Sequence, residues 1–401
     1  MKFRETVIKC FLIGVKMVEK GIFNIVFIQM NGTKTSQGTG GGLFSQELLA
    51  KLLIARGVKV YTITNPRDTY GFQFLGDKRF VAEFIIPSSS AFNWFVFNRK
   101  RLKDELSSIV MRLPEDSLYV TVDPFPSDIY AAKVLKKLGK KVIITMYHIT
   151  PSPLFHPVKR GVLRSVMAWL ISLNALSFVK MNNIPIFLDN KRIASELGWR
   201  FNNNLMEMPL SLPEYKRNSI SETRVGVCFV GRLAKNKGIA DLIQSWRTIV
   251  KKVPGAYLYI IGKDWGNGVY QKMINKYRLQ ESIMITGFLD DEEKKRIMNK
   301  CSIFAFPSYE EGWALAVMEA IDTGLLPVIY NLPAYDYICN KEIKIKVGDV
   351  KKFADTVTYF LLHYEERSTI VKDVQGCIGK FTPAYMAQVW INQIQEYYAS
   401  L

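Results

Sequence analysis

The sequence lacks a long uninterrupted apolar run and a clear processing signal. Its longest mostly apolar stretch, Ser165 to Val179, is interrupted by Ser172, Asn174 and Ser177. It is also shorter than the ~20 residues that a helix needs to cross a bilayer. The N-terminus has no long apolar core with a small-residue cleavage site, so we expect no signal peptide. These absences predict a cytoplasmic chain without a transmembrane helix.

The sequence also lacks the cysteine pairs and ligand clusters that are typical of metal sites. The five cysteines include no CxxC pair; they are Cys10, Cys228, Cys301, Cys339 and Cys377. Most lie in apolar runs, which is typical of buried free thiols in a reducing compartment. The sequence also has no obvious DxD loop and no His/Cys cluster, so we predict neither a metal site nor a bound cofactor.

What the chain does contain is enough apolar residues for more than one core. Its 401 residues exceed one ordinary domain of ~100 to 200 residues. Hydrophobic residues make up 48% and charged residues 22%, which matches globular averages of about 45 to 50% and about 25%. We therefore expect two folded domains.

Positive charge is concentrated in the first half. Residues 1–210 contain 29 Lys and Arg against 15 Asp and Glu, whereas residues 211–401 contain 25 against 21. Charge alone leaves nucleic acid, an anionic membrane and phosphate-bearing small molecules open as partners. No zinc-finger, RRM or helix-turn-helix pattern supports nucleic acid. Apolar residues mixed with Lys and Arg at Phe92 to Arg101 and Leu154 to Val179 favour peripheral contact with an anionic membrane.

Strand-like and helical segments alternate along the first half. The expected strands are Phe23 to Met30, Val58 to Thr64, Phe80 to Ile86, Leu118 to Val122 and Lys141 to Met146. A glycine-rich stretch, Gly38 to Gly42, and a helix-period segment follow the first strand, and a helix is expected at Ser127 to Leu138. This alternation is typical of βαβ units with a parallel sheet.

The same alternation restarts after a proline-containing segment at 207–218, which we predict to be the linker and a hinge. The expected strands here are Val225 to Val230, Tyr257 to Ile261, Ile283 to Thr286, Ile303 to Phe306 and Pro327 to Tyr330. The last segment, Ala384 to Tyr398, has helical periodicity with an apolar side that needs a surface to cover. We predict an α/β fold of two Rossmann-like domains, at 1–210 and 211–383, and a terminal helix at 384–401.

Two cations stand at a strand end in the stretch from Gly231 to Gly238. The backbone N–H groups of a following helix start attract phosphate oxygens. Arg232 offers a planar donor fork and Lys237 a compact charge. The segment would suit a diphosphate, and a basic helix start on a solvated surface is the alternative interpretation.

Two carboxylates follow another expected strand. Glu311 and Glu319 are eight positions apart, which on one helix is slightly more than two turns, so we expect both on one face. A carboxylate at a strand end can accept hydrogen bonds from sugar hydroxyls, and a second one can hold ribose hydroxyls. An ordinary acidic helix start would also explain Glu310 and Glu311. Glu319 is harder to explain in that way, because it interrupts an apolar helix.

These motifs together resemble family 4 of the retaining glycosyltransferases; they are Gly231-Arg232, Lys237-Gly238, Glu311-Gly312, Glu319-Ala320 and Gly324-x-x-Pro327-Val328-Ile329. The resemblance covers the second half and, more weakly, the glycine-rich loop of the first. It implies the GT-B fold, in which two Rossmann-like domains face each other across a cleft and the last helix packs back on the N-terminal domain. It also implies retaining, metal-free transfer of a sugar from a UDP- or GDP-sugar to a glycan or lipid-linked acceptor, in glycan biosynthesis.

The resemblance assigns catalytic roles by position. Arg232 and Lys237 would bind the donor diphosphate, and Glu319 would bind the ribose. Glu311 would contact the donor sugar near the reacting centre. His148 lies where the family has a strand-end histidine that faces the donor sugar, although a structural histidine is an equal alternative. The predicted catalytic residues are therefore Glu311, His148, Arg232 and Lys237.

Further substrate contacts follow from the same resemblance. Asp123 is a candidate for an acceptor contact, and the remaining predicted contacts are Gly40, Gly41, Gly42, Gly231, Gly262, Gly287, Gly312, Trp313, Ala314 and Leu315. Three departures from the family affect the fit of the donor. Ala314 replaces a frequent glycine, Asn236 replaces a common glutamate, and residues 331–333 replace a usual glycine pair.

Other functions remain open at this point. A GT-B nucleotide-sugar epimerase would turn over its donor without an acceptor. A glycoside hydrolase needs two carboxyls about 5 to 10 Å apart, whereas two glutamates eight apart on one helix lie roughly 12 Å apart. A non-enzymatic basic protein that binds an anionic membrane surface or nucleic acid is the alternative from another class.

Overall fold

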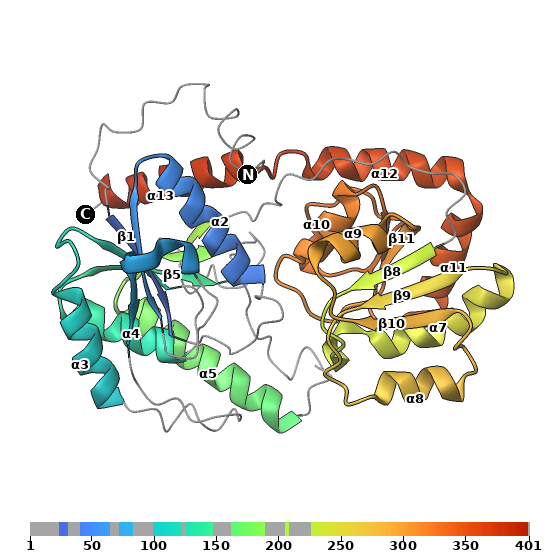
Figure 1. Ribbon diagram of the computed structural model, residues 1–401, viewed down its shortest axis with the longest axis horizontal. Coiled ribbons are helices and arrows are strands. Elements are labelled where there is room, and N and C mark those ends of the chain that lie inside the picture. Colours follow the sequence, from blue (N-terminus) through green and yellow to red (C-terminus); the bar gives the residue numbers. More distant parts are fainter. Residues whose placement is uncertain are drawn as a thin grey trace.

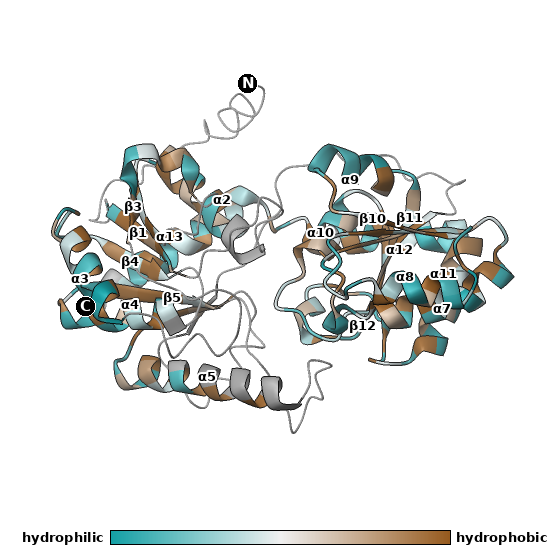
Figure 2. Cartoon of the chain, turned by 60° about the horizontal axis from the view of Figure 1, so that its bottom comes forward, coloured by the Kyte–Doolittle hydropathy of each residue, from teal (hydrophilic) through white to brown (hydrophobic). Residues whose placement is uncertain are grey.

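Two α/β bodies lie side by side, each built on a parallel sheet (Figure 1). The computed structural model describes residues 24–30, 41–64, 72–82, 99–121, 126–146, 162–188, 205–207 and 226–399. In Figure 2 the brown strands of the second body lie between more polar, largely teal helices such as α8 (Val269–Lys276) and α9 (Asp291–Met298). This layering is what alternating apolar strands and amphipathic helices produce.

The sheet of the first body has the order β3-β2-β1-β4-β5-β6-β7, with all pairs parallel. Its strands are β1 (Asn24–Gln29), β2 (Lys59–Thr64), β3 (Arg79–Val81), β4 (Leu118–Thr121), β5 (Lys141–Met146), β6 (Ile186–Leu188) and β7 (Leu205–Glu207). Every residue of β1 is buried, as expected of a central parallel strand covered on both faces. The described helices of this body are α2 (Gly41–Ala55), α3 (Arg99–Val110), α4 (Pro126–Lys137) and α5 (Val162–Met181).

The sheet of the second body has the order β10-β9-β8-β11-β12-β13 and is also parallel. Its strands are β8 (Gly226–Val230), β9 (Tyr257–Ile261), β10 (Ile283–Gly287), β11 (Cys301–Phe306), β12 (Leu326–Tyr330) and β13 (Lys344–Ile345). Besides α8 and α9, its helices are α7 (Ile239–Lys252), α10 (Leu315–Asp322), α11 (Val350–Leu362) and α12 (Tyr364–Ile378). Strand order reverses between β8 and β11, which places the ends of these two strands at the centre of the sheet.

The last helix, α13 (Pro383–Ala399), returns to the first body and packs beside α2 (Figure 1). Its Trp390 is fully buried. The indole lies 4.7 Å from the ring of Phe187 in β6 and 6.3 Å from the ring of Phe27 in β1, measured between ring centroids. The prediction that the last helix packs back on the N-terminal domain is therefore confirmed.

The expected strands are present to within two residues wherever the structure describes them. Strands β6, β7 and β13 were not predicted, because segments of two or three residues carry no recognisable alternation. The domain boundary at 210/211 and most of the linker at 207–218 lie outside the described residues. None of the described helices is long and apolar enough to cross a bilayer.

The expectation of unpaired thiols is wrong for two cysteines. Cys339 and Cys377 form a disulfide with a Cα–Cα distance of 6.5 Å, which joins the segment after β12 to α12. Both positions are at least partly exposed. Cys228 and Cys301 are buried and free, as expected. Cys10 lies outside the described residues.

Candidate active site

Two loops form the candidate site, and neighbouring strands bring them together. The first loop follows β8 and leads through the short 3-10 helix η4 (Lys235–Lys237) into α7. The second follows β11 and leads into α10. β8 and β11 pair in parallel where the strand order reverses. Ligands of open α/β sheets bind outside the carboxyl ends of strands at such a point.

Gly238 permits the close approach of these two loops. It ends η4 with a positive φ of 68°, a conformation that favours glycine. A Cβ atom at this position would lie 1.8 Å from the carbonyl oxygen of Pro307. The loop after β11 therefore packs against backbone that only glycine can provide.

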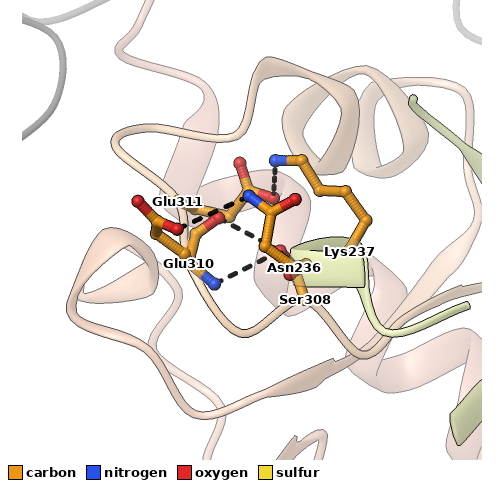
Figure 3. Close-up of polar contacts among 5 residues, drawn as sticks. All are labelled: Asn236, Lys237, Ser308, Glu310 and Glu311. Carbon is orange, nitrogen blue, oxygen red and sulfur yellow. Dashed lines mark hydrogen bonds and ion pairs between the residues drawn. The ribbon is translucent and has the colours of Figure 1, made fainter. Parts of the chain in front are cut away.

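Hydrogen bonds centred on Asn236 join the two loops (Figure 3). The Tyr309 N–H donates to the Asn236 carbonyl oxygen at 2.8 Å, and the Ser308 hydroxyl donates to the same oxygen at 3.3 Å. The Asn236 amide in turn donates to the Glu310 carboxylate at 3.5 Å. Asn236, which the sequence comparison treated as a departure, thus binds the second loop through both its backbone and its side chain.

Lys237 and Glu311 form an ion pair across the two loops, with 2.5 Å between Nζ and Oε1 (Figure 3). Both side chains are largely buried, at 12% and 9% exposure. The Lys237 ammonium also lies 5.9 Å from the centre of the Phe306 ring. A buried charge that loses its partner is costly, by about 3 to 5 kcal/mol. An incoming anion at Lys237 would therefore compete with Glu311, and would free this carboxylate to accept hydrogen bonds from ligand hydroxyls.

The prediction that Glu311 and Glu319 share one helix is wrong. α10 begins only at Leu315, so Glu311 lies in the preceding loop. Ala314, the residue before the helix, has φ 55° and ψ 63°, a left-handed conformation that turns the chain ahead of α10. The distance estimated from helical rise does not apply to these two carboxylates.

Glu319 is buried on α10, where Lys294 of α9 neutralises it. The Lys294 ammonium lies 2.6 Å from Glu319 and 3.1 Å from Asp291, while Glu319 is 11% exposed at its side chain. Burial lowers the pKa of Lys294, but the two carboxylates outweigh it and the pKa is raised. Lys294 was not predicted from the sequence, because its neighbours Asp291 to Lys295 have the pattern of an ordinary charged surface helix.

Arg232 is exposed beside the loop that follows β9. Its guanidinium carbon lies 5.3 Å from the ring centre of Trp265, whose side chain is 57% exposed. Backbone hydrogen bonds join these loops, since Leu233 N donates to Lys263 O and Trp265 N donates to Leu233 O. Trp265 was not predicted from the sequence, because its exposure and its contact with Arg232 are visible only in the structure.

Three predicted glycines lie at neighbouring strand ends. The Gly231 N–H donates to the carbonyl oxygen of Ile261, and the Gly262 N–H donates to that of Gly287. A Cβ atom on Gly262 would lie 1.9 Å from the Gly231 carbonyl oxygen. The ends of β8, β9 and β10 are therefore joined by backbone hydrogen bonds at glycines, where a side chain on Gly262 would not fit.

A polar network beneath the first loop was not predicted. Asp241, at the start of α7, is buried and accepts hydrogen bonds from the hydroxyls of Tyr309 and, at 2.8 Å, of Tyr330. Burial and the Asp241 carboxylate raise the pKa of the Tyr330 hydroxyl. Since Tyr309 is adjacent to Glu310, this network anchors the second loop to α7.

Trp313 is turned into the core. It is 6% exposed and stacks on Tyr337 with 5.2 Å between ring centroids, while Phe381 meets it edge-on. Its neighbours Gly312 and Leu315 are partly exposed. The indole therefore holds the second loop in place, and any substrate contact of this segment would come from the residues around it.

The first body contributes less to the described site. Gly41 and Gly42 are the first residues of α2, close after β1 in the chain. Gly40, Asp123 and His148 lie outside the described residues. The structure thus pairs Lys237 with Glu311, and it places Arg232 beside Trp265 and Glu319 beside Lys294 on the same second body.

Comparison with known proteins finds a family match over the second body. Residues 213–375 match the family model described as "Glycosyl transferases group 1". The uncharacterized glycosyltransferase YqgM of Bacillus subtilis is 26% identical over 144 residues, which are 35% of this chain and 40% of that protein. A GDP-mannose:cellobiosyl-diphosphopolyprenol alpha-mannosyltransferase of Xanthomonas oryzae is 22% identical over 183 residues, 42% of this chain and 48% of that protein. The chain thus matches less than half the length of these relatives.

Solved structures match nearly the whole chain. A sucrose-phosphate synthase from Thermosynechococcus elongatus has a TM-score of 0.76 at 14% identity, and covers 94% of this chain and 100% of its own. Anabaena HepE in complex with UDP-glucose has a TM-score of 0.71 at 14% identity, with the same coverage. At such identities the likeness defines the fold alone. The fold is GT-B, as predicted, and the group 1 match covers the segment that carries the four site residues.

Proposed function

We propose that this protein is a retaining glycosyltransferase of family 4 that moves a sugar from a nucleotide-diphosphate sugar to a glycan or lipid-linked acceptor. The observation that carries the proposal is the buried Lys237–Glu311 pair beside the ends of β8 and β11, within the segment that matches the group 1 model. The proposal places the transfer in glycan biosynthesis.

The proposed chemistry follows from charge. The departing diphosphate gains negative charge as its bond to the sugar breaks, and Arg232 and Lys237 would stabilise that charge without a metal ion. Glu311 would then hold hydroxyls of the donor sugar, and Glu319, held by Lys294, would hold the ribose. Retention requires the acceptor to attack from the face that the diphosphate leaves, so we propose that a phosphate oxygen accepts the acceptor's proton.

Donor and acceptor classes are proposed from the relatives. One relative is named for GDP-mannose and a diphosphopolyprenol acceptor, and HepE was solved with UDP-glucose. We therefore propose a UDP- or GDP-sugar as donor, and a glycan or a lipid-linked glycan as acceptor.

The test measures donor turnover with a panel of UDP-, GDP- and ADP-sugars in the presence of EDTA. Wild type is compared with Lys237→Ala, Glu319→Ala and the control Lys235→Ala, which removes an exposed cation from the same loop. We expect one donor to be consumed, with the first two variants slowed at least ~100-fold and the control nearly unchanged. The anomeric configuration of the product, read by NMR, tests retention.

Three outcomes would contradict the proposal. If no nucleotide sugar reacts or binds, the site is not a donor site. If the donor sugar is epimerised without an acceptor, the protein is an epimerase. If Lys235→Ala is as damaging as Lys237→Ala, the buried ion pair has no special role.

A further inference from the structure

A basic pocket lies between α3, α4 and α5 of the first body, and the proposed transfer reaction does not use it. Its volume is about 480 Å³, and four lysines and two aromatic rings dominate its lining. They are Lys103, Lys133, Lys136, Lys137, Tyr130 and Phe178. None of the lining residues that the structure describes carries a carboxylate.

The four lysines have no acidic partners in the part of the chain that the structure describes. The ammonium of Lys133 lies 4.8 Å from the centre of the Phe178 ring. The nearby Glu105 is paired with Arg101, at 4.0 Å. Four like charges around one hollow repel each other, and an anion in the pocket would relieve this repulsion.

The pocket lies at the edge of the sheet where the strands begin. Lys136 and Lys137 form the last turn of α4, which is followed by β5, and Phe178 is near the end of α5, which is followed by β6. β5 and β6 are parallel neighbours, so the turns that precede them lie side by side. The transfer-site loops and the glycine-rich start of α2 follow strand ends instead. The pocket is therefore separate from the part of the first body that would take part in transfer.

Two exposed apolar side chains flank the pocket at this edge. Leu138, which lines it, is 42% exposed, and Met181, next to the lining residue Asn182, is 78% exposed. Further cations lie close by in the chain, since Lys140, Lys141 and Lys180 belong to the same turns and strand start. The Lys140 ammonium donates to the carbonyl oxygen of Glu115 at 3.4 Å. Apolar anchors among lysines, beside a hollow large enough to hold a phosphate group, are the features of a surface that lies at a membrane interface.

We propose that this edge of the first body docks on membranes that contain anionic phospholipids. A lipid phosphate would occupy the pocket, and Leu138 and Met181 would enter the boundary between head groups and acyl chains. This docking does not depend on the transfer reaction. This surface also differs from the two membrane-contact segments predicted from the sequence, since residues 92–98 lie outside the described structure and α5 contributes only its C-terminal end.

The test measures binding of the full chain to vesicles by sedimentation, with phosphatidylcholine alone or mixed with phosphatidylglycerol. The pocket variant is Lys133→Gln/Lys136→Gln/Lys137→Gln. The charge-matched control, Lys251→Gln/Lys272→Gln/Lys346→Gln, removes three exposed lysines of the second body. Each surface lysine contributes roughly fivefold to affinity for anionic lipid. We expect the pocket variant to lose about 100-fold and the control only a few-fold.

A second variant tests the apolar anchors without changing charge. Leu138→Ser/Met181→Ser should weaken vesicle binding by about tenfold or more, because it removes two buried side chains from the interface. Circular dichroism and donor turnover, if any is found, check that the variants are folded.

The proposal is overturned if wild type shows no preference for anionic vesicles, or if pocket and control variants lose affinity equally. It is also overturned if soluble glycerol phosphate displaces the vesicles at low concentration while the apolar variant binds as wild type. That last result would identify the pocket as a site for a free phosphate ligand. Loss of donor turnover in the Lys237 variant with intact vesicle binding would separate this proposal from that of transfer.

Discussion

At the scale of single residues, Ala314 of the second loop has an unfavourable backbone conformation. It has a positive φ of 55° although it carries a Cβ atom. A left-handed conformation costs a non-glycine residue about 1 to 2 kcal/mol, and such strain persists where the surroundings enforce it. Here the buried Trp313 on one side and α10 on the other impose the turn.

Replacing Ala314 by glycine should therefore stabilise the protein. Relief of the strain exceeds the added flexibility of the unfolded chain, which costs roughly 0.5 to 1 kcal/mol, so we expect a net gain of up to about 1 kcal/mol. Urea unfolding measures it. The control is Ala316→Gly, two residues further on inside α10, where the same change should destabilise by about 1 kcal/mol. If glycine lowers the free energy of unfolding at both positions, Ala314 is not strained.

Lys294 is predicted to stabilise the folded protein through its ion pair with Glu319. Its pKa is raised in the folded protein, so its contribution to stability is fully present below the unfolded value of 10.5 and is lost as pH rises through the folded pKa. The stability difference between wild type and Lys294→Met should therefore be constant near neutral pH and shrink above about pH 10.5. Urea unfolding across this range measures it. A difference that stays constant into strong alkali would contradict the charged pair.

The same variant has a kinetic signature. If Lys294 orients Glu319 toward the donor ribose, Lys294→Met should raise the donor KM more than it lowers kcat. A double-mutant cycle with Glu319→Gln should show strong coupling between the two positions. Additive effects would assign Lys294 a purely structural role.

At the scale of elements, the two loops after β8 and β11 together position the charged residues of the candidate site. Gly238 lets them touch, Asn236 joins them by hydrogen bonds, and Asp241 holds the second loop through Tyr309. These contacts fix the positions of Lys237 and Glu311 before any ligand arrives. Such preorganisation is what electrostatic stabilisation of a leaving group requires.

The close approach at Gly238 predicts that Gly238→Ala is strongly destabilising. The new Cβ atom would collide with the Pro307 carbonyl oxygen, in addition to the cost of a positive φ. We expect a loss of roughly 3 kcal/mol or more. Gly255→Ala is the matched control, because Gly255 also has a positive φ, of 84°, but has nothing within 4 Å of its added Cβ. If thermal unfolding shows equal losses of stability for Gly238→Ala and Gly255→Ala, the two loops can move apart without a cost in stability.

The positions of the strands and helices could be predicted from the sequence more accurately than the contacts between their side chains. The long apolar runs located the central strands, and the glycine and cation pattern located Arg232 and Lys237. Glu311 was misplaced because the apolar period of α10 continues backwards without a glycine to mark the turn at Ala314. Lys294 and Asp241 act through partners that are distant in sequence, and no local pattern reveals such pairs. The Cys339–Cys377 disulfide likewise joins residues 38 apart.

At the scale of the whole molecule, α13 ties the two bodies together. Trp390→Ala should cost about 3 to 5 kcal/mol, because it removes a fully buried indole from beside Phe27 and Phe187. Hydrogen exchange should show lost protection in β1 and β6, with β8 to β12 protected as before. Trp246→Ala, which empties a fully buried site in the second body, should give the reverse pattern. If both variants lose hydrogen-exchange protection equally in the two sheets, the two bodies unfold as one cooperative unit.

The return of α13 also determines how the two bodies could move. The chain passes from the first body to the second between β7 and β8, and passes back between α12 and α13. The chain therefore connects the second body to the first at two places in the sequence instead of one. Two connections limit how far the bodies can separate more than one connection would, because each shortens the reach that the other allows.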